Sequence, residues 1–203
     1  MSEDERVGEL SDEDLALRAA EGSRAACEEL VLRFTPRLFR FLRPKAASDQ
    51  DVEDLIQDSF LKTFRSIGRY DPKWRFSTWL YTTAYRLAVS RWRSPKTESL
   101  SFSPVAQDPG PQEAYDRQDS VRRVWELARE LNRSQFQALW LRYAEDLSVK
   151  EMARVMKKTP INVRVLLHRA RLNLSRAADS VLFADADEET GLESGKIGSL
   201  EWR

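Results

Sequence analysis

The alternation of apolar and polar positions in the first part of the chain predicts helical structure. Between residues 11 and 45, apolar side chains recur three or four positions apart, which is the repeat of one face of an α-helix. Ser11 lies three positions before an acidic residue, a pattern typical of a helix start. Gly22 and Pro36 predict breaks or bends within this stretch, and Pro44 predicts its end.

Two more helices follow in this predicted N-terminal domain. Ser48 or Asp49 caps the first, which runs to about Ile67 and carries one apolar face. The second runs from Ser77 to about Trp92. The face of the first helix opposite its apolar stripe is polar and acidic, with Asp51, Glu53, Asp54, Gln57 and Asp58. Together these helical stretches indicate a compact all-helical domain.

The composition of the chain changes near residue 94. Residues 94–120 contain four prolines and several Ser and Asp residues without apolar periodicity, so they predict an extended linker. Helical periodicity resumes at about Gln118, and the acidic end of the chain again lacks it, which predicts disorder there. The expected fold class is all-α, with two helical domains and a flexible linker. The expected boundaries are a first domain over 11–94, an acidic linker over 95–120, a second domain over 121–178 and an acidic tail over 179–203.

The most specific local signal is a helix-turn-helix pattern within residues 134–178. Ser148 and Glu151 have the spacing of a capping box that opens a short helix. Thr159 caps the next helix and Pro160 takes its first position, after a turn of two lysines. A short helix, a tight turn and a long basic helix is the layout that places the second helix in the DNA major groove. An ordinary solvated basic helix is the alternative. The candidate contacts are Lys157, Lys158, Asn162, Arg164, His168, Arg169 and Arg171.

A second candidate surface combines aromatic and basic side chains. Residues 61–97, here called the aromatic–basic block, hold 8 of the 20 aromatic residues together with 9 basic residues and 1 acidic residue. Aromatic rings stack on unpaired bases with roughly 1–3 kcal/mol each, while cations hold the backbone. Phe64 and Trp79 are interpreted as core residues of the domain. The candidates for binding unpaired DNA are Lys73, Trp74, Arg75, Tyr81, Tyr85, Arg86, Arg91 and Arg93.

The charge distribution along the chain supports two binding modules. The formal net charge is zero, from 33 basic and 33 acidic residues, which by itself argues against a nucleic-acid partner. However, residues 61–97 and 121–178 each carry a net charge of +8, whereas the segments before, between and after them are acidic. Two basic modules joined by an acidic linker indicate binding at two points.

The residue counts exclude several classes of site. A single cysteine excludes a disulfide framework and a cysteine metal cage, and a single histidine argues against a histidine metal site or a Ser-His-Asp triad. No apolar run approaches the roughly 20 residues of a membrane span, and the acidic first residues are unlike a secretory signal. There is no P-loop motif. We therefore expect a cytoplasmic protein that is not an enzyme, with no catalytic residue, metal, cofactor or membrane insertion.

The motifs in these two modules resemble a known family, the bacterial sigma factors. Domain 2 of these factors is similar to Asp54-Leu55-Ile56-Gln57-Asp58, Tyr70-Asp71-Pro72 and Phe76-Ser77-Thr78-Trp79-Leu80. Their domain 4 is similar to Leu141-Arg142-Tyr143, to Leu147-Ser148-Val149-Lys150-Glu151-Met152-Ala153 and to His168-Arg169-Ala170-Arg171. A chain with only these two domains and a linker resembles the extracytoplasmic-function (ECF) group. The resemblance covers about residues 15–178.

The resemblance implies a division of labour between the modules. Asp51, Asp54, Gln57 and Asp58 would dock on the β′ clamp helices of core RNA polymerase. The aromatic–basic block would melt and read the −10 element of promoter DNA, and the helix-turn-helix would read the −35 element and touch the β flap. The acidic linker would pass near the RNA exit path, and an anti-sigma factor would gate the activity.

Four positions depart from the family pattern. The family usually has Asn where this chain has Arg86 and Asp near Ser90, and a polar and a basic residue in place of Val165 and Leu166. These departures leave the promoter sequence open. They also motivate an alternative, a sigma-like protein that binds polymerase or a regulator without initiating transcription.

Overall fold

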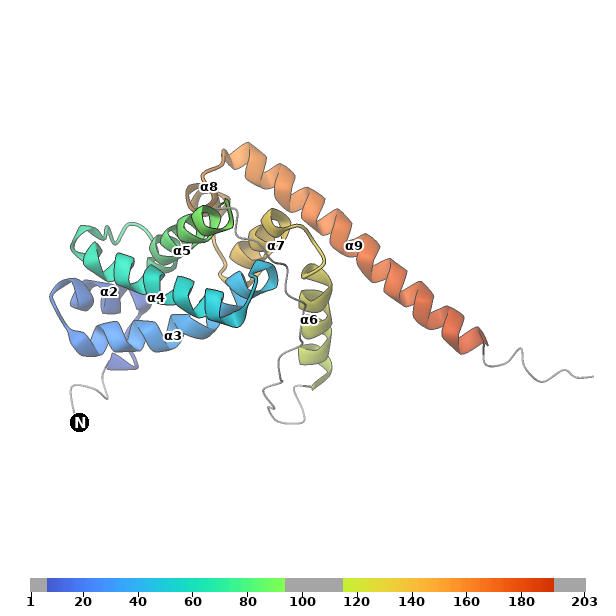
Figure 1. The fold of residues 1–203 in the computed structure, drawn as a ribbon, viewed down its shortest axis with the longest axis horizontal. Helices are drawn as coiled ribbons and strands as arrows, with labels where there is room; N and C mark the ends of the chain where they lie inside the picture. Colours follow the sequence, from blue (N-terminus) through green and yellow to red (C-terminus); the bar gives the residue numbers. More distant parts are fainter. Residues whose placement is uncertain (1–6, 94–114, 192–203) are drawn as a thin grey trace, which may run out of the picture.

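The computed structural model describes residues 7–93 and 115–191, which form helices and short turns and contain no β-strand. Most of the expected linker and the last twelve residues lie outside the described residues. Figure 1 shows the helices as two groups that lie side by side. The first group comprises α2 (Asp12–Ala20), α3 (Arg24–Leu42), η1 (Arg43–Lys45), α4 (Asp49–Arg65), η2 (Ile67–Arg69) and α5 (Phe76–Arg93). The second comprises α6 (Tyr115–Ala128), α7 (Arg133–Leu139), η4 (Trp140–Ala144), α8 (Val149–Met156) and α9 (Pro160–Gly191).

Serine side chains begin three of these helices as the sequence predicts. The Ser11 hydroxyl accepts a hydrogen bond from the Asp14 amide at 3.0 Å at the start of α2. Ser48 does the same for Asp51 at 3.1 Å, which makes Ser48 the cap of α4. Each cap satisfies an amide that has no partner inside the helix. Ser148 caps α8 in the same way.

The first helical stretch is broken at one of its two predicted points. Gly22 has a φ of +96° and separates α2 from α3, as predicted. Pro36, by contrast, lies inside α3, so the helix is not interrupted there. Proline removes the bond to the carbonyl of Leu32, but Leu32 lies on the exposed side, where water can satisfy that carbonyl. The fully buried side chains of Phe34 and Leu38 hold both halves of the helix against the core.

The core of the first group lies between α3, α4 and α5. The ring of Phe76 at the start of α5 meets that of Phe34 edge-on, with 5.4 Å between centroids. Tyr70 and Trp79 form a second edge-on pair at 6.0 Å. Phe64 and Trp79 pack partly buried against this core, as expected for them. The packing holds α5 with one face inward and leaves Arg86 exposed.

The second group is built around aromatic side chains and a long last helix. The Trp125 ring of α6 lies 5.0 Å from that of Trp140, and both contact Phe136 of α7. Helix α6 begins at Tyr115, so the last part of the expected linker is helical. Helix α9 continues to Gly191 and projects from the body of the molecule (Figure 1), so the first part of the expected tail is helical and the rest lies outside the described residues. Good helix formers such as Ala and Glu in this stretch favour that extension.

None of the helices within 7–93 and 115–191 has the length and apolar character needed to cross a membrane.

Candidate nucleic-acid interface

The helix-turn-helix is fixed by reciprocal capping bonds. The Ser148 hydroxyl accepts from the Glu151 amide at 3.3 Å, and the Glu151 carboxylate accepts from the Ser148 amide at 2.8 Å. Lys157 ends α8 in the left-handed region, with φ 50° and ψ 46°, and the Lys158 amide donates to the Ala153 carbonyl at 3.0 Å. Thr159 then caps α9 by accepting from an amide of its first turn at 3.2 Å. The predicted capping box, turn and second helix are therefore confirmed.

Burial works against the charge of the Glu151 carboxylate, but its hydrogen bonds outweigh this effect. Ser148 donates to it from both its hydroxyl and its amide, and Thr78 donates at 3.1 Å. Together with the nearby charge of Arg75, these bonds hold the pKa of Glu151 below its ordinary value. The Glu151 carboxylate is therefore ionised at neutral pH, the form in which it accepts the hydrogen bonds of the capping box.

The outward face of α8 and α9 is basic. Val163, Leu167 and Ala170 are buried and attach α9 to the rest of its domain. All seven predicted contacts of the helix-turn-helix are exposed: Lys157, Lys158, Asn162, Arg164, His168, Arg169 and Arg171. No acidic residue occurs between positions 152 and 178. An exposed helix that carries several basic side chains and no acidic one over these positions fits the phosphate-lined major groove.

The aromatic–basic block does not form one open surface. Lys73, Arg75 and Arg86 are exposed, and Tyr85 is half-buried. Tyr81 is fully buried, although the sequence predicts that it contacts DNA. The side chain of Arg93 lies outside the described part of the chain.

Arg91 lies beside the predicted polymerase-binding residues of α4. Its guanidinium donates to the Asp51 carbonyl at 3.1 Å. It also lies 3.9 Å from the Asp51 carboxylate, 3.8 Å from that of Asp54 and 4.0 Å from that of Asp58. These four residues, Asp51, Asp54, Gln57 and Asp58, are called the acidic face of α4 below. The charge of Arg91 partly neutralises the negative charge of this face. The predicted contact of Arg91 with DNA remains a prediction.

The acidic face of α4 continues into an open depression. Asp58, Leu61, Lys62 and Arg65 of α4 line it together with Leu87 of α5. Leu61 is 54% exposed at this depression. Leu61 and Leu87 add apolar area to a mostly charged lining, and such mixed surfaces occur in protein–protein interfaces.

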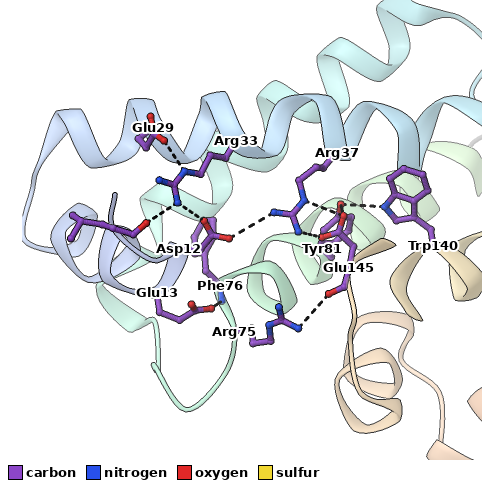
Figure 2. Close-up of polar contacts among 11 residues, drawn as sticks. Asp12, Glu13, Glu29, Arg33, Arg37, Arg75, Phe76, Tyr81, Trp140 and Glu145 are labelled. Atoms are coloured by element: carbon purple, nitrogen blue, oxygen red, sulfur yellow. Dashed lines mark hydrogen bonds and ion pairs between the residues drawn. The ribbon is translucent and has the colours of Figure 1, made fainter. Parts of the chain in front are cut away.

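A buried carboxylate joins the two groups of helices (Figure 2). Glu145 follows η4, and its side chain is only 1% exposed. Arg37 of α3 forms a two-pronged ion pair with it, and the Tyr81 hydroxyl donates to it at 2.6 Å. The Trp140 indole donates to the same hydroxyl at 3.4 Å. Burial, followed by the charge of Glu145, raises the pKa of Tyr81 well above its ordinary value.

The domain interface is the surface at which α3, α5 and the residues just before α5 meet the segment from η4 to α8. Further contacts extend it. Arg75 donates to the Asp146 carbonyl at 2.9 Å and to the Glu145 carbonyl at 3.4 Å. The Arg154 guanidinium lies 4.4 Å from the centre of the Trp74 ring, and the Lys150 ammonium lies 5.4 Å from it. Two cations of α8 therefore cover a ring that the sequence predicts to stack on DNA bases.

Sequence reasoning missed the residues that make this interface. Glu145 stands in an acidic pair at a helix end, a pattern that usually indicates a solvated surface. Arg37 lies 108 positions before Glu145 in the chain, and periodicity within one helix cannot reveal such a pairing. The two domains, expected to be flexibly joined, are packed together through these side chains.

Comparisons with known proteins identify both groups of helices. The family Sigma-70 region 2 matches residues 30–97, and the family Sigma-70, region 4 matches residues 122–174. The ECF RNA polymerase sigma-E factor of Haemophilus influenzae is 30% identical over 183 residues, which cover 80% of this chain and 93% of that protein. The ECF RNA polymerase sigma factor BldN of Streptomyces coelicolor is 28% identical over 169 residues, covering 80% of this chain and 64% of that longer protein.

A solved structure shows the same fold. It is the sigma factor RpoE of Bartonella quintana, determined in complex with the anti-sigma factor NepR. Its TM-score is 0.58 at 20% sequence identity, and the match covers 75% of this chain and 96% of RpoE.

Proposed function

The chain belongs to the ECF group of the sigma-70 family, and we propose that it binds core RNA polymerase and directs the enzyme to specific promoters. The observation that carries this proposal is the exposed helix-turn-helix, whose surface has no acidic residue between positions 152 and 178. It occurs in one chain with a region 2 domain whose helix α4 carries a separate acidic face. Two such surfaces support simultaneous binding of DNA and of a protein.

The second domain, over 121–178, reads the −35 element in this proposal. The start of α9 enters the major groove, and Arg164, Arg169 and Asn162 contact base edges or phosphates there. Lys157 and Lys158 at the turn, together with His168 and Arg171, contact the phosphate backbone. The same domain touches the β flap of the polymerase.

The first domain, over 11–94, binds the polymerase and reads the −10 element. The acidic face of α4 docks on the β′ clamp helices, and the exposed Leu61 supports this role by adding apolar area. Lys73, Trp74, Arg75, Tyr81, Tyr85, Arg86, Arg91 and Arg93 are proposed to hold and stack the melted strand. The linker over 95–120 then connects the two domains across the polymerase.

The packed arrangement of the two domains is the free form of the protein in this proposal. Trp74 is covered by Arg154 and Lys150, and Tyr81 is bound to Glu145, so neither ring is open to a base. Separation of α5 from α8 on the polymerase would release the Trp74 ring and the Tyr81 hydroxyl, whereas the Tyr81 ring also packs edge-on against Phe41 of its own domain at 5.0 Å. Because these side chains are covered, the free protein should have a low affinity for random DNA. The neutral net charge of the whole chain agrees with this.

An anti-sigma factor is a further proposed partner, as RpoE of Bartonella quintana has in its complex with NepR. Sigma factors are not enzymes, and we propose no catalytic group for this chain; the chemistry of transcription belongs to the polymerase.

We propose that the chain acts in the cytoplasm, where promoter DNA and polymerase meet.

Selection of DNA by the reconstituted holoenzyme tests the function. Core polymerase and the full chain are incubated with a library of random duplexes, and the bound DNA is sequenced. We expect enrichment of a two-part motif with a constant spacing. The double variant Arg164→Gln, Arg169→Gln should lose the upstream part alone, whereas the matched variant Arg122→Gln, Arg123→Gln on α6 should retain it. Stable holoenzyme that enriches no motif would refute promoter direction.

A further inference from the structure

The centre of the exposed face of α9 is apolar rather than polar. Ile161 is 68% exposed and Val165 is 44% exposed, and neither side chain is part of the core. The two residues lie four positions apart, so one stands above the other along the same side of the helix. His168 follows on the same line. This line is opposite the buried residues Val163 and Ala170.

Positive charge flanks this apolar line on both sides. Arg164 lies on one side of it and Arg169 on the other, as helical spacing requires, and both are exposed. The nearest turn adds Lys157 and Lys158. Two copies of this chain could not pair through this surface, because their like charges repel each other. A protein partner would need acidic side chains on both sides of an apolar contact. Two strands of phosphates on either side of a groove complement the arrangement directly.

Val165 and Leu166 are the two residues of this helix that differ from the family pattern. Packing explains one of them and not the other. Leu166 is partly buried against the core of its domain. Val165 faces outward, where the family usually has a polar residue. A valine or isoleucine cannot donate or accept a hydrogen bond at a base edge. The thymine methyl group is the one apolar group on the major-groove edge of a base pair in unmodified DNA.

We infer that Ile161 and Val165 read thymine methyl groups in the −35 element, which makes them specificity-determining residues of this helix. The inference rests on the proposed function and deepens it. The two residues are about 6 Å apart along the helix axis, at 1.5 Å per residue. Base pairs follow one another at about 3.4 Å, so the two methyl groups belong to thymines about two base-pair steps apart, on either strand.

Replacement of thymine by deoxyuridine tests the inference, because it removes the methyl group and leaves every hydrogen bond. The probe is the duplex selected by the wild-type holoenzyme, with each −35 thymine replaced in turn. We expect affinity to fall about fourfold at each of two positions, the effect of losing one buried methyl-sized group. Val165→Ala should abolish the difference between thymine and deoxyuridine at one position, and Ile161→Ala at the other.

Val124→Ala is the matched control, because Val124 on α6 is 47% exposed and lies outside the helix-turn-helix. It should keep both differences. The inference is overturned if deoxyuridine weakens binding at no position, if the selected −35 element has no thymine, or if both alanine variants retain the wild-type differences. A holoenzyme that selects no −35 element at all refutes the proposed function itself, so the two failures are distinguishable.

Discussion

At the scale of single residues, Glu145 has the greatest consequence for the arrangement of the molecule. Its carboxylate is nearly inaccessible to solvent and is held by Arg37 and by the Tyr81 hydroxyl. A buried carboxylate is stable only while such partners remain in place. The closed arrangement therefore depends on three side chains from two domains.

Replacement of Glu145 by alanine should lower the free energy of unfolding by about 1–3 kcal/mol, since it leaves the buried Tyr81 hydroxyl without its acceptor. Urea denaturation followed by circular dichroism measures this. Glu28→Ala removes a comparable but exposed pair with Arg24 and should leave stability unchanged. Equal stability of both variants and the wild type would show that Glu145 is not held in this way.

The buried tyrosines predict a loss of stability at high pH. Burial first, and then nearby carboxylates, raise the pKa of Tyr81 and of Tyr70. Stability is therefore complete below the unfolded pKa of about 10 and falls as the pH rises above it, because the unfolded chain releases protons that the folded chain retains. Tyr81→Phe should flatten this fall in urea denaturation between about pH 8 and 11. The exposed residue Tyr143 provides the control Tyr143→Phe, which should follow the wild-type curve; parallel curves for all three proteins would contradict the expectation.

At the scale of helices, the sequence is a good guide to starts and a poor guide to lengths. Ser48, Ser148 and Thr159 are caps in the structure as predicted, because a cap is a local bond between residues three positions apart. The continuation of α3 through Pro36 was not predictable, because it depends on packing against other helices. The exposure of the seven residues proposed to contact DNA follows from the same local pattern, and their contacts remain a prediction.

The capping box of α8 offers a test at this scale. Ser148→Ala removes the acceptor for the Glu151 amide and a donor to its carboxylate. We expect the free energy of unfolding to fall by about 1 kcal/mol, with weaker −35 binding by the holoenzyme. Thermal denaturation and fluorescence anisotropy measure the two effects. Ser175→Ala, at an exposed position inside α9, should cause neither loss, and an unaffected Ser148→Ala variant would contradict the role of the cap.

At the scale of the whole molecule, one surface binds the second domain and is also the surface that we propose binds DNA. Trp74, Arg75 and Tyr81 bind the second domain in the closed form and are proposed to bind DNA in the open form. Their residue types indicated DNA binding from the sequence. Their present partners come from helices far away in the chain, so the closed arrangement could be seen only in the structure.

Charge reversal at Glu145 should open the molecule. Glu145→Lys would place a third cation beside Arg37 and near Arg75, which the interface cannot accommodate. We expect a larger radius of gyration in X-ray scattering and tighter binding of single-stranded −10 DNA by the free protein. Glu28→Lys changes the net charge equally at an exposed site and should behave as the wild type does. A Glu145→Lys variant that stays folded, compact and unable to bind the strand would show that the interface does not mask the −10 residues.

Run-off transcription from the selected promoter tests the central claim most directly. Core polymerase is combined with the full chain, nucleotides and a linear template that carries the two-part motif selected by the holoenzyme. We predict a transcript of one defined length, absent with core polymerase alone and absent when either part of the motif is scrambled. Stable binding of the chain to core polymerase without a transcript from that template would contradict the claim and favour a protein that binds polymerase without initiating.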